Sequence, residues 1–310
     1  MRAAALIRAG KLVAFPTETV YGLGANALDA EAVLRVFEVK GRPAASPVIV
    51  HVDSIEMARG LALEWPPEAE LLARRHWPGP LTLVLRKSPL IPDVVTAGLA
   101  TVGLRVPAHP LALELIRAAG TPIAAPSANR FAQLSPTTAE HVRAGLGASV
   151  DLILDGGTTT VGIESTVLSL TGGVARLLRP GMVSQTEIED LIGPVETGQS
   201  QLGLPGHESP GMHPRHYSPR TPLLLVSGGV LPAQGRGAYL YREAREGIPA
   251  AVQGVAMPAE ASAYASVLYE TLHALDREEL EWIAVERLPD GPEWAGVADR
   301  LERAAAKGSS

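Results

Sequence analysis

A segment rich in glycine, proline and serine divides the 310-residue chain into two parts of unequal length. It covers residues 197–222 and reads TGQSQLGLPGHESPGMHPRHYSPRTP. Proline interrupts helices and central strands, and glycine weakens both, so no regular element is expected to continue through this stretch. We therefore predict a large domain over residues 1–196, a linker over 197–222 and a small domain over 223–310.

Apolar runs of strand length outnumber helical patterns in the first part. Several neighbouring runs follow one another without a helix between them, so we predict an α/β fold with a large, twisted, mixed sheet and not a regular doubly wound one. The predicted strands cover residues 12–15, 47–52, 81–85, 101–106, 122–125, 152–155, 166–170 and 174–178, and the predicted helices cover 1–12, 30–39, 54 onward, 66–76, 110–119 and 137–146.

Strands alternate with helices after the linker, which predicts a small Rossmann-like α/β domain of three layers. Gly228 and Gly229 follow its first strand, but they make a poor dinucleotide fingerprint, so no ligand is assigned to this domain. The predicted strands cover residues 223–226, 238–241, 254–257 and 282–286, and the predicted helices cover 262–275 and 292–306.

Composition restricts the function. The formal net charge is −6, whereas a nucleic-acid-binding protein normally has a basic excess, so any contact with a nucleic acid is expected to be local, weak or indirect. The absence of cysteine excludes a thiol nucleophile, a thiolate zinc site and disulfides. Arg8 and Lys11 interrupt the apolar N-terminal stretch, so we expect no membrane segment and a cytoplasmic protein. With aromatic residues at 4%, the core is expected to consist of Ala, Val and Leu.

Polar and cationic residues stand where predicted elements end. In FPTETVYGLG (residues 15–24) the glycines allow a close approach of backbone to a ligand, although an ordinary turn explains them equally well. Lys40 and Arg42 in KGRP either cap a helix or bind triphosphate oxygens at the rim of the next strand. His51, in the run PVIVHV, is either a core residue or faces a cleft together with Asp53.

A second group of polar residues follows the later strands. Arg105, within TVGLRVP, needs a partner, which is either a bound carboxylate or an internal Asp or Glu. Ser127 and Asn129 in APSAN follow a strand, at the end where α/β sheets bind ligands, or they shape a turn. Arg179, before Pro-Gly, is a further cation at a strand end.

The motifs FPTETVYGLG, KGRP, SPVIVHV, GLRVP, APSAN, ESTV and LRPG, in this order, closely resemble the YrdC/YwlC/Sua family of threonylcarbamoyl-AMP synthases over residues 1–195. The linker sequence PGMHPRHYSP and the α/β tail are similar to the longer, two-domain members. The resemblance implies an open, positively lined concave cleft. It also implies synthesis of L-threonylcarbamoyl-AMP from L-threonine, bicarbonate and ATP with release of pyrophosphate, the first step of threonylcarbamoyladenosine formation in tRNAs that decode ANN codons.

The resemblance also implies individual site residues. Ser46 departs from the Asn of many members, and Tyr217 is similar to a residue that folds over the nucleotide. Lys40 and Arg42 are the implied catalytic residues. The implied L-threonine contacts are Thr19, His51, Arg105, Ala125 and Ser165, and the implied ATP contacts are Lys40, Arg42, Ser46, Thr101, Ser127, Asn129, Ser135, Arg179 and Tyr217.

The chemistry implied by the family suits these residues. A carbamate oxygen attacks the α-phosphorus of ATP and pyrophosphate leaves, so a nucleotidyltransferase of this kind needs position and charge neutralisation and no protein nucleophile. Mg²⁺ is expected to accompany ATP, and no protein metal ligands are assigned. The linker is hypothesised to act as a lid that excludes water. The implied downstream partner is the tRNA threonylcarbamoyl-transferase machinery.

Three other interpretations of the sequence are disfavoured. A non-catalytic protein that binds double-stranded RNA or the ribosome is disfavoured by the acidic charge balance. A carbamoyl-transfer module of hydrogenase maturation proteins is disfavoured because the zinc-binding cysteines and an acylphosphatase part are missing. A metal site at His207, His213 and His216 is disfavoured by weak spacing and by the neighbouring Arg215.

Overall fold

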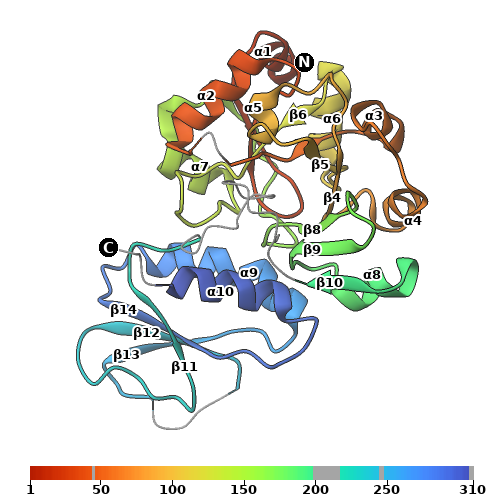
Figure 1. Ribbon diagram of the computed structural model, residues 1–310. Coiled ribbons are helices and arrows are strands. Elements are labelled where there is room, and N and C mark those ends of the chain that lie inside the picture. Colours follow the sequence, from red (N-terminus) through yellow and green to blue (C-terminus); the bar gives the residue numbers. More distant parts are fainter. Residues whose placement is uncertain (44–45, 198–216, 244–247, 307–310) are drawn as a thin grey trace.

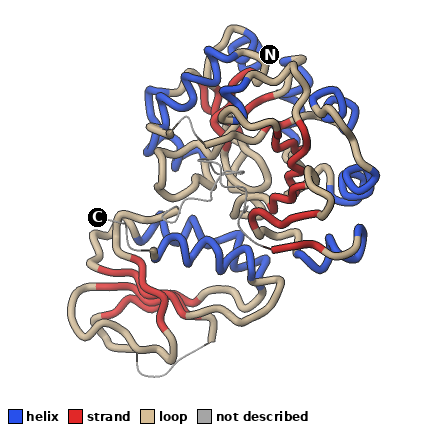
Figure 2. Tube along the Cα trace, in the orientation of Figure 1, coloured by secondary structure: helices blue, strands red, loops and turns tan. Residues whose placement is uncertain are grey.

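The computed structural model describes the chain except for residues 44–45, 198–216, 244–247 and 307–310 (grey in Figures 1 and 2). Most of the predicted linker, its hypothetical lid function and the three histidines His207, His213 and His216 therefore lie outside the described residues. The described parts contain one sheet before the linker and one after it.

The strands before the linker form a single mixed sheet. They are β1 (Val13–Phe15), β2 (Gly22–Asn26), β3 (Val50–His51), β4 (Leu81–Arg86), β5 (Thr101–Arg105), β6 (Ile123–Ala124), β7 (Leu152–Ile153), β8 (Thr166–Ser169), β9 (Ala175–Arg179) and β10 (Val195–Thr197). Their order is β10-β9-β8-β4-β5-β3-β6-β2-β1-β7. The pairs β1–β2, β2–β6, β3–β6, β4–β5 and β8–β9 are antiparallel, and β1–β7, β3–β5, β4–β8 and β9–β10 are parallel. The predicted mixed sheet is thus confirmed.

Helices surround this sheet (Figures 1 and 2). They are α1 (Arg2–Arg8), α2 (Ala30–Lys40), α3 (Ile55–Leu61), α4 (Pro67–His76), α5 (Asp93–Thr96), α6 (Pro110–Ala119), α7 (Ala139–Leu146) and α8 (Gln185–Ile192). The predictions missed β2, β10, α5 and α8. The strand β2, with the sequence GLGAN, consists largely of residues depleted in strands. The helix α8 begins at a capping box of Ser184 and Glu187, a signal that the sequence does contain.

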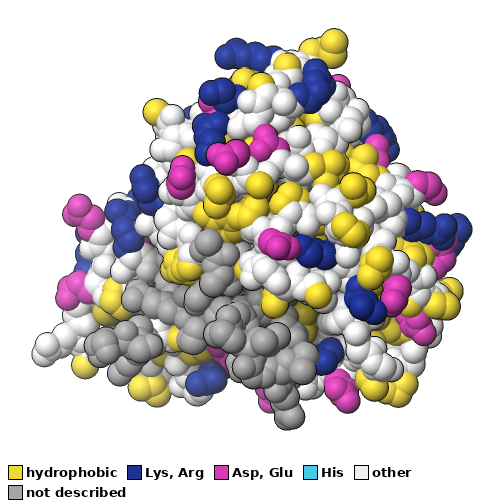
Figure 3. Space-filling view, turned by 45° about the horizontal axis from the view of Figure 1, so that its top comes forward, with side chains coloured by type: hydrophobic (Ala, Val, Ile, Leu, Met, Phe, Trp, Pro, Cys, Tyr) yellow, Lys and Arg dark blue, Asp and Glu magenta, His cyan; other side chains and the backbone are white. Residues whose placement is uncertain are grey.

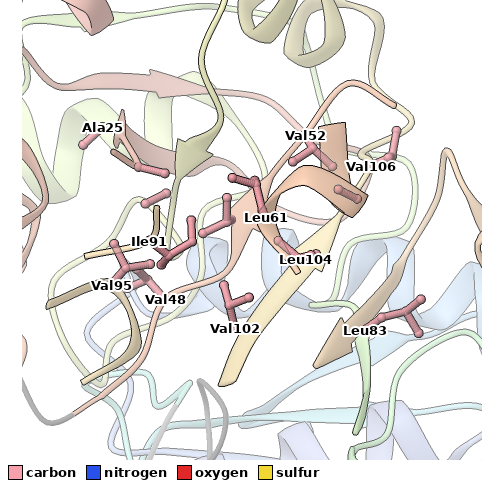
Figure 4. Packing of buried hydrophobic residues seen from close by; sticks show 14 of the residues in the cluster. Ala25, Val48, Val52, Leu61, Leu83, Ile91, Val95, Val102, Leu104 and Val106 are labelled. Atoms are coloured by element: carbon pink, nitrogen blue, oxygen red, sulfur yellow. The ribbon is translucent and has the colours of Figure 1, made fainter. Parts of the chain in front are cut away.

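The core of the first part is aliphatic, as the low aromatic content predicts. Valine and leucine side chains from β3, β4 and β5 pack against Leu61 of α3 and against Ile91 and Val95 near α5 (Figure 4). Leu83, Leu104 and Ile91 are each at most 2% exposed. This packing holds the strands whose ends carry the polar motifs.

The second part has four parallel strands in the order β11-β14-β12-β13. They are β11 (Leu223–Val226), β12 (Gly237–Tyr241), β13 (Val252–Ala256) and β14 (Trp282–Glu286), accompanied by the helices α9 (Ala261–Leu275) and α10 (Ala295–Ala305). The α/β prediction is confirmed, but three layers are wrong, because both helices lie on one face of the sheet (Figure 1). The described connections between β11, β12 and β13 contain no helix that covers the other face.

The two parts share a hydrophobic core. Figure 1 shows α9 and α10 between the four-stranded sheet and the first domain. One buried cluster combines Val20, Leu134 and Ile163 of the first domain with residues such as Leu268 and Val297 of these helices. The C-terminal domain therefore packs directly against the segments around residues 20, 134 and 163, where the polar motifs lie.

Candidate active site

A narrow cavity of about 50 Å³ lies where several motif loops of the first domain meet. All five predicted L-threonine contacts line this cavity. Four of the predicted ATP contacts line it as well. The lining residues are Thr17, Thr19, Val20, Gly22, Arg42, Ile49, His51, Arg105, Ala125, Pro126, Ser127, Glu164, Ser165, Arg179 and Tyr217.

Strand pairing brings one half of these residues together. His51 ends β3 and Arg105 ends β5, and the two residues are register partners in the parallel β3–β5 pair. Thr19 reaches the same place, because its hydroxyl accepts a hydrogen bond from Arg105 Nη2 at 3.0 Å. Polar side chains at the carboxyl ends of adjacent strands thus converge on one point, as in other α/β sheets.

Arg105 has an internal partner. Its Nη2 donates to Glu18 Oε1 at 2.7 Å, and both side chains are buried. The other carboxylate oxygen of Glu18 accepts from the backbone N–H of Ala108 at 2.9 Å. Of the two partners considered for Arg105, the structure therefore contains the internal carboxylate, and Glu18 is a site residue that the sequence reasoning did not assign.

His51 is neutral in this environment. Burial, and then the nearby Arg105, lower the pKa of His51 to about 3. Its Nδ1 is buried and has no hydrogen-bond partner among the described residues. A buried polar atom without a partner costs free energy, so this nitrogen is suited to a ligand that supplies the missing hydrogen bond.

The other half of the cavity is strongly cationic. Arg179 donates from Nε to the backbone oxygen of Ser165 at 3.0 Å and from Nη2 to its hydroxyl at 3.2 Å. Arg42 donates to the backbone oxygen of Pro47 at 3.1 Å, and its Nε has no partner in the described part of the chain. Burial, with repulsion from Arg179, lowers the pKa of Arg42 to about 10, so the guanidinium group of Arg42 stays charged at neutral pH.

Lys40 lies next to the cavity and not in its lining. Helix α2 ends at Gly41, which has the left-handed φ of 62°, and this places Lys40 on the inner side of the turn. Its ammonium group donates to the backbone oxygens of Ser127 and Asn129 and, at 3.3 Å, to Asn129 Oδ1. Burial and then Arg42 hold the pKa of Lys40 well below its usual value. In the structure Lys40 fixes the APSAN loop.

Four further predicted ATP contacts lie outside the cavity lining. Asn129 lines a second cavity of about 400 Å³ between the two domains. Thr101 lines a small hollow that shares Ile49 with the first cavity. Ser135 is fully buried and donates to Glu164 Oε1. Ser46 is buried near the end of the KGRP turn.

Glu164 connects this site to the C-terminal domain, which the sequence reasoning did not foresee. Its Oε2 accepts from Arg300 Nε of α10 at 2.7 Å and from the Tyr269 hydroxyl of α9 at 3.2 Å. Burial raises the pKa of Glu164, but Arg300 and Arg179 together bring it below the usual value. The motif ESTV contains Glu164, whereas its partner is 136 residues away, so no local signal identifies the pair.

Tyr217 forms another wall and is 1% exposed. Its ring lies under the guanidinium of Arg300, at 5.2 Å from the ring centroid, and at 6.1 Å from the ring of Tyr269. The next residue, Ser218, donates its backbone N–H to the oxygen of Ala132 at 3.0 Å. Tyr217 thus lines the cavity, and its contact with the nucleotide stays a prediction.

The buried charges all surround this cavity. Among the described residues, seven Lys, Arg, Asp or Glu residues are buried: Glu18, Lys40, Arg42, Arg105, Glu164, Arg179 and Arg300. Five are cations and two are carboxylates, so the site has an excess of positive charge. Buried charge needs compensation, which makes an anionic ligand the natural occupant.

The described residues contain no group of three or more His, Cys, Asp or Glu residues arranged to hold a metal ion. No helix among them is long and apolar enough to span a membrane.

Fold and site together define an α/β protein with a buried, cationic recess at the strand ends. Comparison with known proteins gives its family. Residues 5–181 match the family described as "Telomere recombination" (Sua5_yciO_yrdC), and residues 183–306 match "Threonylcarbamoyl-AMP synthase, C-terminal domain". The chain therefore belongs to the Sua5/YciO/YrdC family, in a form with both parts, and the resemblance read from the motifs is confirmed.

Individual relatives agree with this assignment. The threonylcarbamoyl-AMP synthase of Bacillus subtilis is 42% identical, over 98% of this chain and 92% of its own length. The enzyme of that name from Pyrococcus abyssi is 53% identical over 73% of this chain and 67% of its own. The crystal structure of P. abyssi Sua5 complexed with L-threonine superposes with a TM-score of 0.89 at 40% identity, covering 98% of this chain and 93% of that chain.

Proposed function

We propose that this protein is an enzyme that makes L-threonylcarbamoyl-AMP from L-threonine, bicarbonate and ATP and releases pyrophosphate. The observation that carries the proposal is the buried cationic cavity, lined by residues from all the family motifs, in a chain that matches threonylcarbamoyl-AMP synthases along nearly its whole length. All three substrates are anionic or carry a carboxylate, which suits this excess of positive charge.

The two halves of the cavity suggest where the substrates bind. We assign L-threonine to the half with Thr19, His51 and Arg105, because His51 Nδ1 has no hydrogen-bond partner within the described part of the chain and can form one with a ligand. The triphosphate then occupies the half with Arg42 and Arg179, since guanidinium groups pair well with phosphate oxygens.

The reaction needs little covalent help from the protein. The threonine amine and bicarbonate form a carbamate with loss of water, a carbamate oxygen attacks the α-phosphorus, and the bond to the pyrophosphate oxygen breaks. The residues' contribution is to hold the carbamate in line with the leaving group and to neutralise the charge that develops on the phosphates. This nucleotidyl transfer is consistent with a cavity in which the fixed positive charges of Arg42 and Arg179 face the negative charge of the phosphates.

Mg²⁺ is assigned to the nucleotide and not to the protein. The buried carboxylates at the site, Glu18 and Glu164, are each paired with an arginine, so neither is well placed to act as a metal ligand. We propose that Mg²⁺ enters with ATP, held by phosphate oxygens, where it would share the neutralisation of the triphosphate charge.

The remaining parts of the proposal concern the cell. We propose a cytoplasmic enzyme whose product is used by tRNA threonylcarbamoyl-transferase machinery, with at most a weak direct tRNA contact. The alternative of a non-catalytic RNA-binding or ribosome-binding protein is not favoured. On the face seen in Figure 3, lysine and arginine side chains are interspersed with aspartate and glutamate, whereas RNA binding calls for a continuous basic surface.

The test is a defined reaction. The purified protein is incubated with ATP, Mg²⁺, bicarbonate and L-threonine, and pyrophosphate and the adenylate are measured by mass spectrometry, with threonine and bicarbonate omitted in turn. We expect pyrophosphate release that needs both substrates and is lost in Arg42→Ala. Turnover indifferent to threonine, or no turnover by the folded protein, would refute the proposal and favour RNA binding.

A further inference from the structure

Arg300 of the C-terminal domain contacts two residues that line the cavity, Glu164 and Tyr217, and also Pro180, the residue after Arg179. Arg300 is 1% exposed. Its Nε and Nη2 donate to the carboxylate and the backbone oxygen of Glu164, at 2.7 and 3.1 Å. Its Nη1 donates to the backbone oxygen of Pro180 at 3.0 Å, and its guanidinium lies over the ring of Tyr217. One side chain thus joins the ESTV motif, the LRPG motif and the residue at the end of the linker.

These contacts lie directly beside the groups that face the triphosphate half. Glu164 precedes Ser165, which accepts hydrogen bonds from Nε and Nη2 of Arg179, and Pro180 follows Arg179. The position of Arg179 is therefore set from both sides by backbone that Arg300 holds. Gly296, one turn before Arg300, allows this approach, because a Cβ there would lie 2.8 Å from the Cα of Gly181.

We propose that Arg300 is a positioning residue for the nucleotide half of the active site, and that the C-terminal domain completes the site through it. The inference rests on the function proposed above. It adds that Arg300 balances the charge of Glu164, so that this carboxylate competes less with the anionic ligand for Arg42 and Arg179.

The pairing of Arg300 with Glu164 changes the charge that faces the ligand. Glu164 lines the same cavity as Arg42 and Arg179. With Arg300 present, its carboxylate has a cation on the side away from the ligand. Without Arg300, the buried carboxylate would be compensated by Arg179 instead, and it would oppose the triphosphate directly, since opposite buried charges attract strongly at low effective dielectric.

The L-threonine half depends on a different pair. Arg105 is held by Glu18, Thr19 and the backbone oxygen of Gly79, and none of the contacts of Arg300 among the described residues reaches them. Loss of Arg300 should therefore weaken ATP binding more than L-threonine binding, which Arg300 reaches only through Ser165, the residue after Glu164. A purely structural role would weaken both substrates together.

The experiment uses the full chain and compares Arg300→Met with Arg300→Met/Glu164→Gln, which removes both buried charges. Arg303→Met is the matched control, because Arg303 also pairs with Asp299 on α10 but is not among the residues that line the cavity. KM is measured separately for ATP and L-threonine, and folding is checked by circular dichroism. The wild-type protein must make the adenylate; if it does not, the proposed function fails, independently of Arg300.

In an active wild-type background we expect Arg300→Met to raise the KM for ATP by about tenfold or more, equivalent to about 1.4 kcal/mol, with the KM for threonine within about threefold. The double variant should recover most of the ATP effect, and Arg300→Lys, which keeps the charge, should lie between wild type and Arg300→Met. An unchanged KM for ATP, or equal rises for both substrates, overturns the inference. If Arg300→Met does not fold, a folded double variant with a KM for ATP raised about tenfold overturns it as well.

Discussion

The contact between α9 and the ESTV loop can be tested at Gly162, which lies two residues before Glu164. Gly162 has φ of +80°, and a Cβ there would lie 2.3 Å from the backbone oxygen of Ala265 and 2.6 Å from the Cα of Ser266. Since atoms pack at about 3.5 Å or more, Gly162→Ala requires α9 to move by about 1 Å. The substitution therefore perturbs the contact between the two domains.

Gly157 provides a matched control in the same region. Its φ is +78°, but a Cβ there would meet nothing within 4 Å. The left-handed backbone costs an alanine about 1–2 kcal/mol at either position. Overpacking adds about 1–3 kcal/mol at Gly162 alone. We therefore expect Gly157→Ala to lose about 1–2 kcal/mol of unfolding free energy and Gly162→Ala about 2–5 kcal/mol.

Urea denaturation of the two variants and the wild type, followed by circular dichroism, measures these free energies. The difference between the variants isolates the steric contact with α9, because the backbone term is common to both. Losses that agree within about 0.5 kcal/mol would refute the reasoning, since the domains would then not be in the close contact described here.

Three other predictions concern the ligand cavity. Burial and the nearby Arg105 lower the pKa of His51 from 6.5 to about 3 in the folded protein. As the pH falls below 6.5, the histidine is therefore protonated in the unfolded chain but not in the folded protein, and the free energy of unfolding decreases. When the pH is lowered from 7 to 5, the unfolding free energy of His51→Gln, measured by urea denaturation, should fall by about 2 kcal/mol less than that of the wild type. Equal decreases in the two proteins would contradict this prediction. Glu18→Gln should cost about 3–5 kcal/mol in the same assay, with partial recovery on adding Arg105→Met; a loss below about 1 kcal/mol argues against the buried pair. Arg42→Met should raise the KM for ATP by about tenfold or more in steady-state kinetics and spare that for threonine, so equal rises would reject the assignment of the two halves.

Much of the fold was predictable because its signals are local. Apolar runs such as residues 81–85 and 101–106 have strand length and became β4 and β5. The mixed sheet followed from neighbouring runs without a helix between them. The wrong prediction of three layers has a physical cause: the alternation of elements along the chain does not determine on which face of a sheet each helix packs, and α9 and α10 share a face.

Residues of the candidate site were predictable where a polar side chain stands at the end of an apolar run of strand length. His51 and Arg105 end paired strands, so a polar residue in an apolar run indicated both. Partners distant in sequence were not predictable. The choice between a ligand and Glu18 for Arg105 depends on how the loop after β1 folds back, and the pairing of Glu164 with Arg300 depends on domain packing. Lys40 illustrates a third limit, because its turn directs the ammonium group to backbone oxygens and not into the cavity.

The shared core and the long-range pair also have a consequence for synthesis on the ribosome. Glu164 precedes Arg300 by 136 residues, an interval of about 7–27 s at typical elongation rates of about 5–20 residues per second. Throughout that time Val20, Leu134 and Ile163 lack their C-terminal neighbours, and the carboxylate of Glu164 lacks its main cation. The nascent first domain is thus an unfinished molecule with an apolar face, and a chaperone that protects this face during translation would act on a state that the completed enzyme never shows.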